Sequence, residues 1–332
     1  MTSVEVWNQS RFQRVQDQFQ QGSLPHAVLL MGPEGIGREN FAQALAQWLL
    51  CLNRQDEACG ECKSCFLFDA GHHPDYHLLD IEPEKTQISV GQVRELITSM
   101  QESSHQGGWK VSNITNVQAM NASSFNALLK TLEEPQENTL LILQTSQLQG
   151  VPPTIRSRAQ LLSLSVDDQE GVKQWLMERQ GSLSQALEAA LNLFPQAPYK
   201  AEDFGVNGDT LKYAEFIVQM NDLVQGSNTP IQMAQFWHED VADAVFWMQL
   251  MVRDILLIQQ AGKQADLLFM QQKQELEVLA KAINGQGWLM LLEKINELQR
   301  LIKQKSPVNL MASWQSLLIF VTQIASKYKP LD

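Results

Sequence analysis

A short apolar run that leads directly into a glycine-rich turn and then a helix limits the fold of this chain more than any other feature. Residues 27–31 read Ala-Val-Leu-Leu-Met, which predicts a buried strand, and a helical pattern continues after the turn to about Leu50. Gly32 and Gly37 bracket the turn. This order is typical of a parallel sheet whose crossover helices cover its faces. We therefore expect an α/β domain at the start of the chain.

Short apolar runs continue to alternate with helical patterns until about residue 165. The pattern predicts further strands at 76–81, 110–114, 139–144 and 160–164, and a helix at 121–134 that Pro135 ends. Only helical patterns follow, including a long apolar stripe over 310–324 that is typical of a helical bundle. The expected fold class is α/β plus all-α, with domains at 1–165, 166–207 and 208–332.

The charge balance limits the class of function. The chain has 25 Lys and Arg residues against 37 Asp and Glu residues, a net charge of -12. Proteins that hold nucleic acid by its phosphates are basic, so nucleic-acid binding is expected only within an assembly that supplies positive charge. No apolar run approaches the ~18 residues of a membrane span, and the first residues lack a signal-peptide pattern. We expect a soluble, cytoplasmic protein that does not contact membranes.

All four cysteines of the chain lie within fifteen residues: Cys51, Cys59, Cys62 and Cys65. Disulfides would require an oxidising compartment, which nothing in the sequence indicates, and four reduced thiols clustered by chance are a second alternative. Overlapping C-x-x-C pairs favour a tetrahedral zinc site with four thiolate ligands. Three nearby histidines could replace a ligand: His72, His73 and His77. Because four thiolates fill a structural site, we expect Zn²⁺ at 51–65 without the histidines and without an open catalytic position.

The glycine turn resembles a phosphate-binding loop that has lost its functional side chains. The functional pattern is G-x-x-x-x-G-K-[ST], and here Gly32 and Gly37 are followed by Arg38 and Glu39. Arg38 is a planar cation that does not replace the lysine point charge, and the Glu39 carboxylate repels phosphate where a hydroxyl would bind magnesium. We expect ATP not to bind, and a turn kept for packing is the alternative role of the glycines.

A second position required of an ATPase is also altered. A functional site has an acidic residue at the end of a later strand, where it holds the metal. Strand 110–114 runs into Thr115 and Asn116, which are neutral and cannot activate water. Intrinsic ATP hydrolysis is therefore disfavoured.

These features occur in an order that resembles a known family. The altered loop and the cysteine module are followed by His-Pro-Asp at 73–75, Asn-Ala-Leu-Leu-Lys-Thr-Leu-Glu-Glu-Pro at 126–135, and Ser-Arg at 157–158. This order closely resembles the delta-prime subunits of the bacterial DNA polymerase III clamp loader, members of the AAA+ superfamily. The resemblance is strong over residues 20–160, and the ten-residue string is its most specific element.

The resemblance implies both a fold and a role. The fold is a RecA-like AAA+ domain with the zinc module inserted, a helical lid and a C-terminal helical collar for oligomerisation. The role is that of a non-hydrolysing subunit in a five-subunit ring with gamma/tau-type ATPases and a delta subunit. That ring opens the sliding clamp and loads it on primed DNA during replication. Arg38 and Glu39 fit a subunit without ATPase activity.

Arg158 is the residue for which the resemblance implies a catalytic role. It would reach the ATP site of a neighbouring gamma-type subunit as a trans-acting arginine finger, although Ala159 replaces the cysteine that follows in the family motif. Arg156 is expected to be a lesser, structural residue. Because both follow strand 139–144, we expect them at the ligand-binding edge of the sheet. Residues 197–199 offer no second-sensor arginine for the lid.

Three classes of function are compatible with these observations. The first is a catalytically silent subunit that completes the site of a neighbour, and the second is a weak ATPase or nucleotide switch acting on its own. The third is a zinc-ribbon protein that binds nucleic acid, which the net charge of -12 disfavours. The second class would require Arg38 and Glu39 to perform the functions of the lysine and serine that normally occupy these positions.

Overall fold

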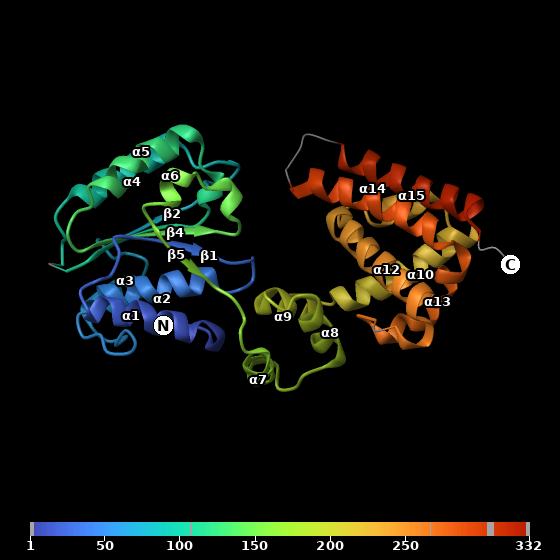
Figure 1. Cartoon of the computed structure of the whole chain (residues 1–332), viewed down its shortest axis with the longest axis horizontal. Coiled ribbons are helices and arrows are strands. Elements are labelled where there is room, and N and C mark those ends of the chain that lie inside the picture. The colour runs from blue at the N-terminus through green and yellow to red at the C-terminus, as the bar shows by residue number, and fades with distance from the viewer. Residues whose placement is uncertain (1–2, 107, 266, 304–308, 330–332) are drawn as a thin grey trace. The chain divides into compact units, whose positions relative to one another are not determined.

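The chain forms two compact units in the computed structural model (Figure 1). The structure describes residues 3–106, 108–265, 267–303 and 309–329. The first unit contains Met1–Leu183 and Phe194–Glu202, and the second contains Ser184–Leu193 and Asp203–Asp332. The predicted division into three domains, with boundaries at residues 165 and 207, is not tested by these two units and stays a prediction.

A five-stranded parallel sheet lies at the centre of the first unit. Its strands are β1 (Ala27–Met31), β2 (Tyr76–Leu79), β3 (Lys110–Ile114), β4 (Thr139–Thr145) and β5 (Gln160–Ser163). Their order is β2-β3-β4-β1-β5, and each neighbouring pair is parallel. The strands β3 and β4 are buried along their whole length because helices cover both faces. The α/β fold class is confirmed, and each strand ends within two residues of its predicted end.

Helices of the first unit pack on both faces of the sheet (Figure 1). One face carries α4 (Val90–Gln101), α5 (Ala122–Glu133) and α6 (Pro153–Arg156), and the other carries α1 (Gln9–Gln20), α2 (Arg38–Leu50) and α3 (Lys63–Asp69). The unit also contains α7 (Gln169–Gln180), the start of α9 (Pro198–Val206) and three short 3-10 helices at Val6–Asn8, Val117–Ala119 and Leu148–Gly150.

Packing explains the apolar part of the ten-residue string at 126–135. Most of the string lies in α5, whose N-terminus is capped by the Asn121 side chain, which accepts the N–H of Ser124 at 2.9 Å. Leu128 and Leu132 are buried in the core that α4 and α5 form against the sheet. The exposed residues of the string, including Glu133, are not explained by this core.

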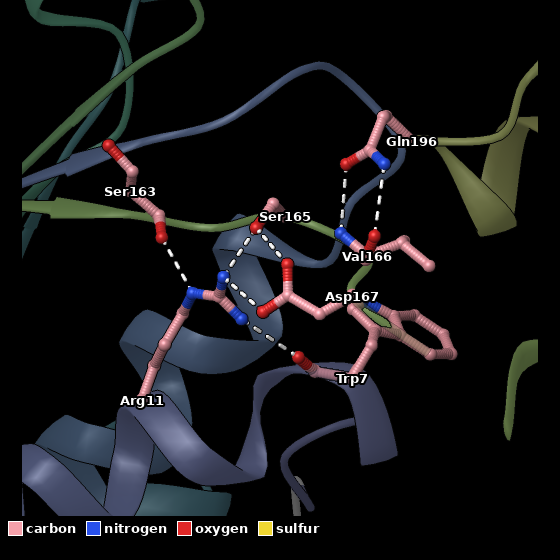
Figure 2. A network of polar contacts seen from close by, with 7 residues as sticks. All are labelled: Trp7, Arg11, Ser163, Ser165, Val166, Asp167 and Gln196. Atoms are coloured by element: carbon pink, nitrogen blue, oxygen red, sulfur yellow. Dashed lines mark hydrogen bonds and ion pairs between the residues drawn. The ribbon is translucent and has the colours of Figure 1, made fainter. Parts of the chain in front are cut away.

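An arginine of α1 holds the connection between β5 and α7 (Figure 2). The Arg11 Nε donates to the carbonyl oxygen of Ser163 at 2.7 Å, and Nη2 pairs with the Asp167 carboxylate at 2.7 Å. The Gln196 side chain forms two hydrogen bonds with the backbone of Val166, at 2.8 and 3.0 Å. The connection is therefore fixed from two sides within the first unit.

The second unit is entirely helical in its described part. It contains α8 (Gln185–Leu193), the end of α9, α10 (Asp209–Gln225), α11 (Pro230–Phe236), α12 (Val241–Ala261), α13 (Lys273–Ala282), α14 (Gly285–Lys303), α15 (Leu310–Lys327) and 3-10 helices at Gly262–Gln264 and Met270–Gln272. Apolar stripes on α12 and α15 are buried, so the predicted all-α part is confirmed. Among the described helices, none combines the length and the apolar character needed to cross a membrane.

Candidate functional site

A pocket lies at the carboxyl edge of the sheet, where β1, β2, β3 and β4 end. Arg38 and Glu39 at the start of α2 line it together with Gly37, as expected for a former phosphate loop. Residues at or just beyond the ends of the other strands also line it: Asp80, Thr115, Asn116 and Gln144. Parallel pairing brings all of these segments to one edge.

Arg38 occupies the lysine position but lacks a full set of partners. Its Nη1 atom is buried and has no hydrogen-bond partner in the described part of the chain. Burial lowers the pKa of the Arg38 guanidinium, and the carboxylates of Glu34 and Glu39 partly offset this effect. The pocket wall therefore presents two carboxylates beside one cation, an arrangement that opposes binding of a polyphosphate.

Asp80 is a pocket residue that no sequence motif indicated. Its Oδ1 accepts a hydrogen bond from the Asn116 amide at 3.1 Å. Burial raises the pKa of Asp80, but hydrogen bonds from the Thr115 hydroxyl, a backbone N–H and Asn116 outweigh burial and lower it. The apolar pattern predicts a strand that continues through residue 80 to residue 81, whereas β2 ends at Leu79. A carboxylate thus stands beside the two neutral residues after β3.

The N-terminal segment covers the glycine loop from another side. The Glu5 side chain accepts hydrogen bonds from the Asn40 amide at 2.8 Å and the Tyr199 hydroxyl at 3.0 Å, and the residue is only 5% exposed. Burial raises the pKa of Glu5, and these hydrogen bonds from neutral groups offset only part of that effect. Burial and the Glu5 carboxylate likewise raise the pKa of Tyr199. A buried carboxyl group is therefore held next to the loop.

Aromatic residues close the same side of the loop. The Trp175 ring lies 5.0 Å from the ring centroid of Trp7 and 5.0 Å from that of Tyr199, in edge-to-face arrangements. Trp7 Nε1 donates to the carbonyl oxygen of Ile36 at 2.9 Å, and the Tyr199 N–H donates to that of Gly35 at 3.0 Å. The loop backbone is thus engaged by its own chain. Tyr199 also occupies the region that offers no second-sensor arginine.

The four cysteines come together after α2, as predicted. Their Sγ atoms all lie within 4.8 Å of one another, with Cys51 Sγ 3.5 Å from Cys59 Sγ and 3.9 Å from Cys62 Sγ. Four Zn–S bonds of about 2.3 Å in a tetrahedron place sulfur atoms about 3.8 Å apart, so the cluster fits a zinc ion. Burial raises the pKa of Cys62, but N–H groups of Cys65 and Leu52 and the neighbouring thiols outweigh burial and lower it to about 6.

Ser64 ties the cysteine module to the α/β core. Its hydroxyl donates to the carbonyl oxygen of Leu50 at 2.6 Å and lies 2.8 Å from Nε2 of His73. Because His73 Nδ1 accepts the N–H of Asp75 at 3.1 Å, the ring proton belongs on Nε2 and is donated to Ser64. Burial lowers the pKa of His73, in keeping with a neutral ring. His73 therefore supports the module through a residue that lies between two of the cysteines.

Arg158 lies near the amino edge of the sheet, opposite the pocket, and its predicted position at the ligand-binding edge is wrong. It precedes β5 by two residues, and Gln160 at the start of β5 pairs with Val28 near the start of β1. The chain returns across the sheet after β4, so a place after that strand does not keep a residue at the carboxyl edge. The strand β1 spans roughly 16 Å over its five residues, and it runs from the edge near Arg158 to the edge that carries the glycine loop.

Comparison with known proteins gives a consistent result. Family models described as DNA polymerase III, delta subunit, and its C-terminal part match residues 7–168 and 210–322. The DNA polymerase III subunit delta' of Yersinia pestis is 34% identical over 262 residues, 77% of each chain. That of Pseudomonas aeruginosa is 30% identical over 331 residues, 96% of this chain and 99% of the relative. The DNA polymerase III subunit tau/gamma of Haemophilus influenzae is 36% identical over 154 residues, 46% of this chain and 22% of the relative.

Proposed function

This chain belongs to the family of DNA polymerase III delta-prime subunits, as its resemblance predicted, and from that premise we propose that it acts within the clamp loader. It is an accessory subunit of the polymerase holoenzyme that helps load the sliding clamp on primed DNA. Its partners are gamma/tau-type ATPase subunits and a delta subunit in a five-subunit ring. A net charge of -12 fits a subunit that reaches DNA through its partners.

The position of Arg158 is the observation that carries this proposal. The residue stands at the edge opposite its own glycine loop, and its side chain is 36% exposed although it pairs with Glu133, so the guanidinium can face a nucleotide held by another subunit. A guanidinium beside the γ-phosphate stabilises the charge of the transition state and is worth ~10³–10⁵ in rate in other systems. Arg158 is therefore the trans-acting finger in this proposal.

The chain has no ATPase activity of its own in this proposal. The altered Arg38 and Glu39, the buried Glu5 carboxylate and the aromatic cover of the loop support this view. A weak ATPase or nucleotide switch is the alternative, and Asp80 is the pocket residue that favours it, because a carboxylate can hold magnesium. Calorimetric titration with MgATP decides between them: micromolar affinity in the unmodified chain supports the alternative, and no binding heat supports the silent subunit.

The cysteine cluster holds one structural zinc ion in this proposal. Four thiolates complete the coordination of the metal and leave no position for water, so the ion supplies folding energy and no catalysis. The metal would fix the loop after α2 to the α/β core, beside the Ser64 and His73 hydrogen bonds.

The finger is tested by Arg158→Ala in a reconstituted clamp loader. We expect the variant to assemble, with lower DNA-stimulated ATPase and clamp-loading rates. The fall should be partial, because the other ATP sites of the ring keep their own arginines. Arg156→Ala is the matched control, since Arg156 is exposed two residues away. If Arg158→Ala leaves both rates unchanged while Arg156→Ala lowers them, the finger is Arg156 and not Arg158. If neither variant changes the rates, the chain acts only as a scaffold.

A further inference from the structure

The Arg158 guanidinium is held on one side by its own chain. Nη2 lies 2.8 Å from Oε1 of Glu133, and Nη1 donates to the carbonyl oxygen of Thr154 at 3.0 Å. The Arg158 side chain stays 36% exposed and that of Glu133 50% exposed. The guanidinium is thus restrained in orientation while part of it remains open to solvent.

The two restraints come from different helices that pack against each other. Glu133 is the last residue of α5, and Thr154 lies in the single turn of α6. Carbonyl oxygens at a helix C-terminus lack partners within the helix and attract cations, so the end of α5 is a favourable place for a guanidinium. Arg156 differs: it is exposed, and its side chain has no hydrogen bond or ion pair with the residues that the structure describes.

We propose that Glu133 is a positioning residue for Arg158, an inference that rests on the proposed finger role. A long side chain loses rotamer freedom when it is fixed against a ligand, and this loss weakens the interaction. Glu133 and Thr154 restrict the guanidinium before a neighbouring subunit arrives, so less freedom remains to be lost in the transition state. A surface ion pair adds little to folding stability, so its effect is on orientation.

This role also explains an exposed residue of the ten-residue string at 126–135. Leu128 and Leu132 belong to the core, but the core gives no reason for a carboxylate at residue 133. Glu133 contacts Arg158, which is 25 residues further along the chain. The string at 126–135 and the Ser-Arg pair at 157–158 are therefore in direct contact in the folded chain.

A double-mutant cycle in the reconstituted complex tests the proposal. We expect Glu133→Ala to lower DNA-stimulated kcat by about half or more of the effect of Arg158→Ala, with KM for ATP unchanged, and to have no further effect when Arg158 is already alanine. Glu133→Gln keeps an oxygen acceptor at the same place and should recover most of the rate. Glu134→Ala is the control, because Glu134 is an exposed neighbour that makes no ion pair in the described structure.

The outcomes separate this inference from the finger assignment. A normal or raised rate in Glu133→Ala, with a lowered rate in Arg158→Ala, would refute the positioning role and keep the finger. An equal fall in both backgrounds would show that Glu133 acts elsewhere, which also refutes it. If Arg158→Ala itself changes nothing, the proposed finger fails and the positioning role fails with it.

Discussion

The Glu5 carboxylate lies so close to Gly37 that a Cβ atom on residue 37 would come within 2.4 Å of Glu5 Oε1. Gly37 also has a φ of 92°, in the left-handed region that glycine adopts without strain. Both facts favour glycine at this position, and neither involves a nucleotide. The packing role considered for the glycine turn therefore has a structural basis at Gly37.

Gly37→Ala should destabilise the first unit by about 1–3 kcal/mol more than Gly22→Ala. Gly22 has a φ of 66°, and a Cβ atom added to it would meet nothing within 4 Å, so Gly22→Ala reports the backbone strain alone. The difference in urea unfolding between the two variants contains the contact with Glu5 together with the greater backbone strain at a φ of 92°. Adding Glu5→Ala to Gly37→Ala should recover part of the loss, and equal effects of the two glycine substitutions would contradict the contact.

Glu5→Gln should stabilise the first unit at neutral pH. Burial raises the folded-state pKa of Glu5 above 4.5, so the folded chain binds this proton more tightly than the unfolded chain does. Stability of the unmodified protein therefore falls as the pH rises from about 4.5 through the folded-state pKa of Glu5. The glutamine amide of the variant does not titrate, so this decrease in stability is absent from it. Unfolding at about pH 4.5 and about pH 7.5 should show an advantage of glutamine that grows with pH. Glu34→Gln, at an exposed loop position, is the control variant.

The purified chain should contain one zinc ion, and Cys62→Ser should lose it. Ser64→Ala should keep the four ligands but weaken zinc affinity about ten- to a hundredfold, because Ser64 links the module to Leu50 and His73. Transfer of zinc to a chromogenic chelator measures the change. Lys63→Ala is the control, since Lys63 is exposed and adjacent. Well under one zinc per chain, with all thiols titratable, would exclude the metal site.

Arg11→Ala should loosen the connection between β5 and α7. The Arg11 guanidinium holds both Ser163 and Asp167, so its loss removes restraints at both ends of residues 163–167. Amide hydrogen exchange in that segment should become faster, while exchange in β1 should not change. Arg14→Ala, which removes an exposed cation from the same helix, should leave both segments as they are. Unchanged exchange in Arg11→Ala would show that Gln196 and packing are sufficient.

Local sequence patterns determined the elements of this protein and two of its sites. Strands such as 27–31 and 110–114 can be predicted from runs of a few residues, because a strand buried on both faces requires consecutive apolar side chains. The cysteine cluster is equally local, since its four thiols lie within fifteen residues and a short loop brings them together. The altered phosphate loop is a continuous segment as well. Each of these features depends on neighbours in the chain.

The tertiary structure decided which distant residues meet. Strand order placed Asp80 beside Asn116, and the return of the chain across the sheet moved Arg158 to the edge opposite its loop. Glu5 meets Tyr199 across 194 residues at 3.0 Å, a contact that no periodicity within either segment encodes. Such contacts depend on the sheet order and the crossovers, which no single segment specifies. The sequence therefore determined the candidate chemical groups, and the fold determined which of them face one another.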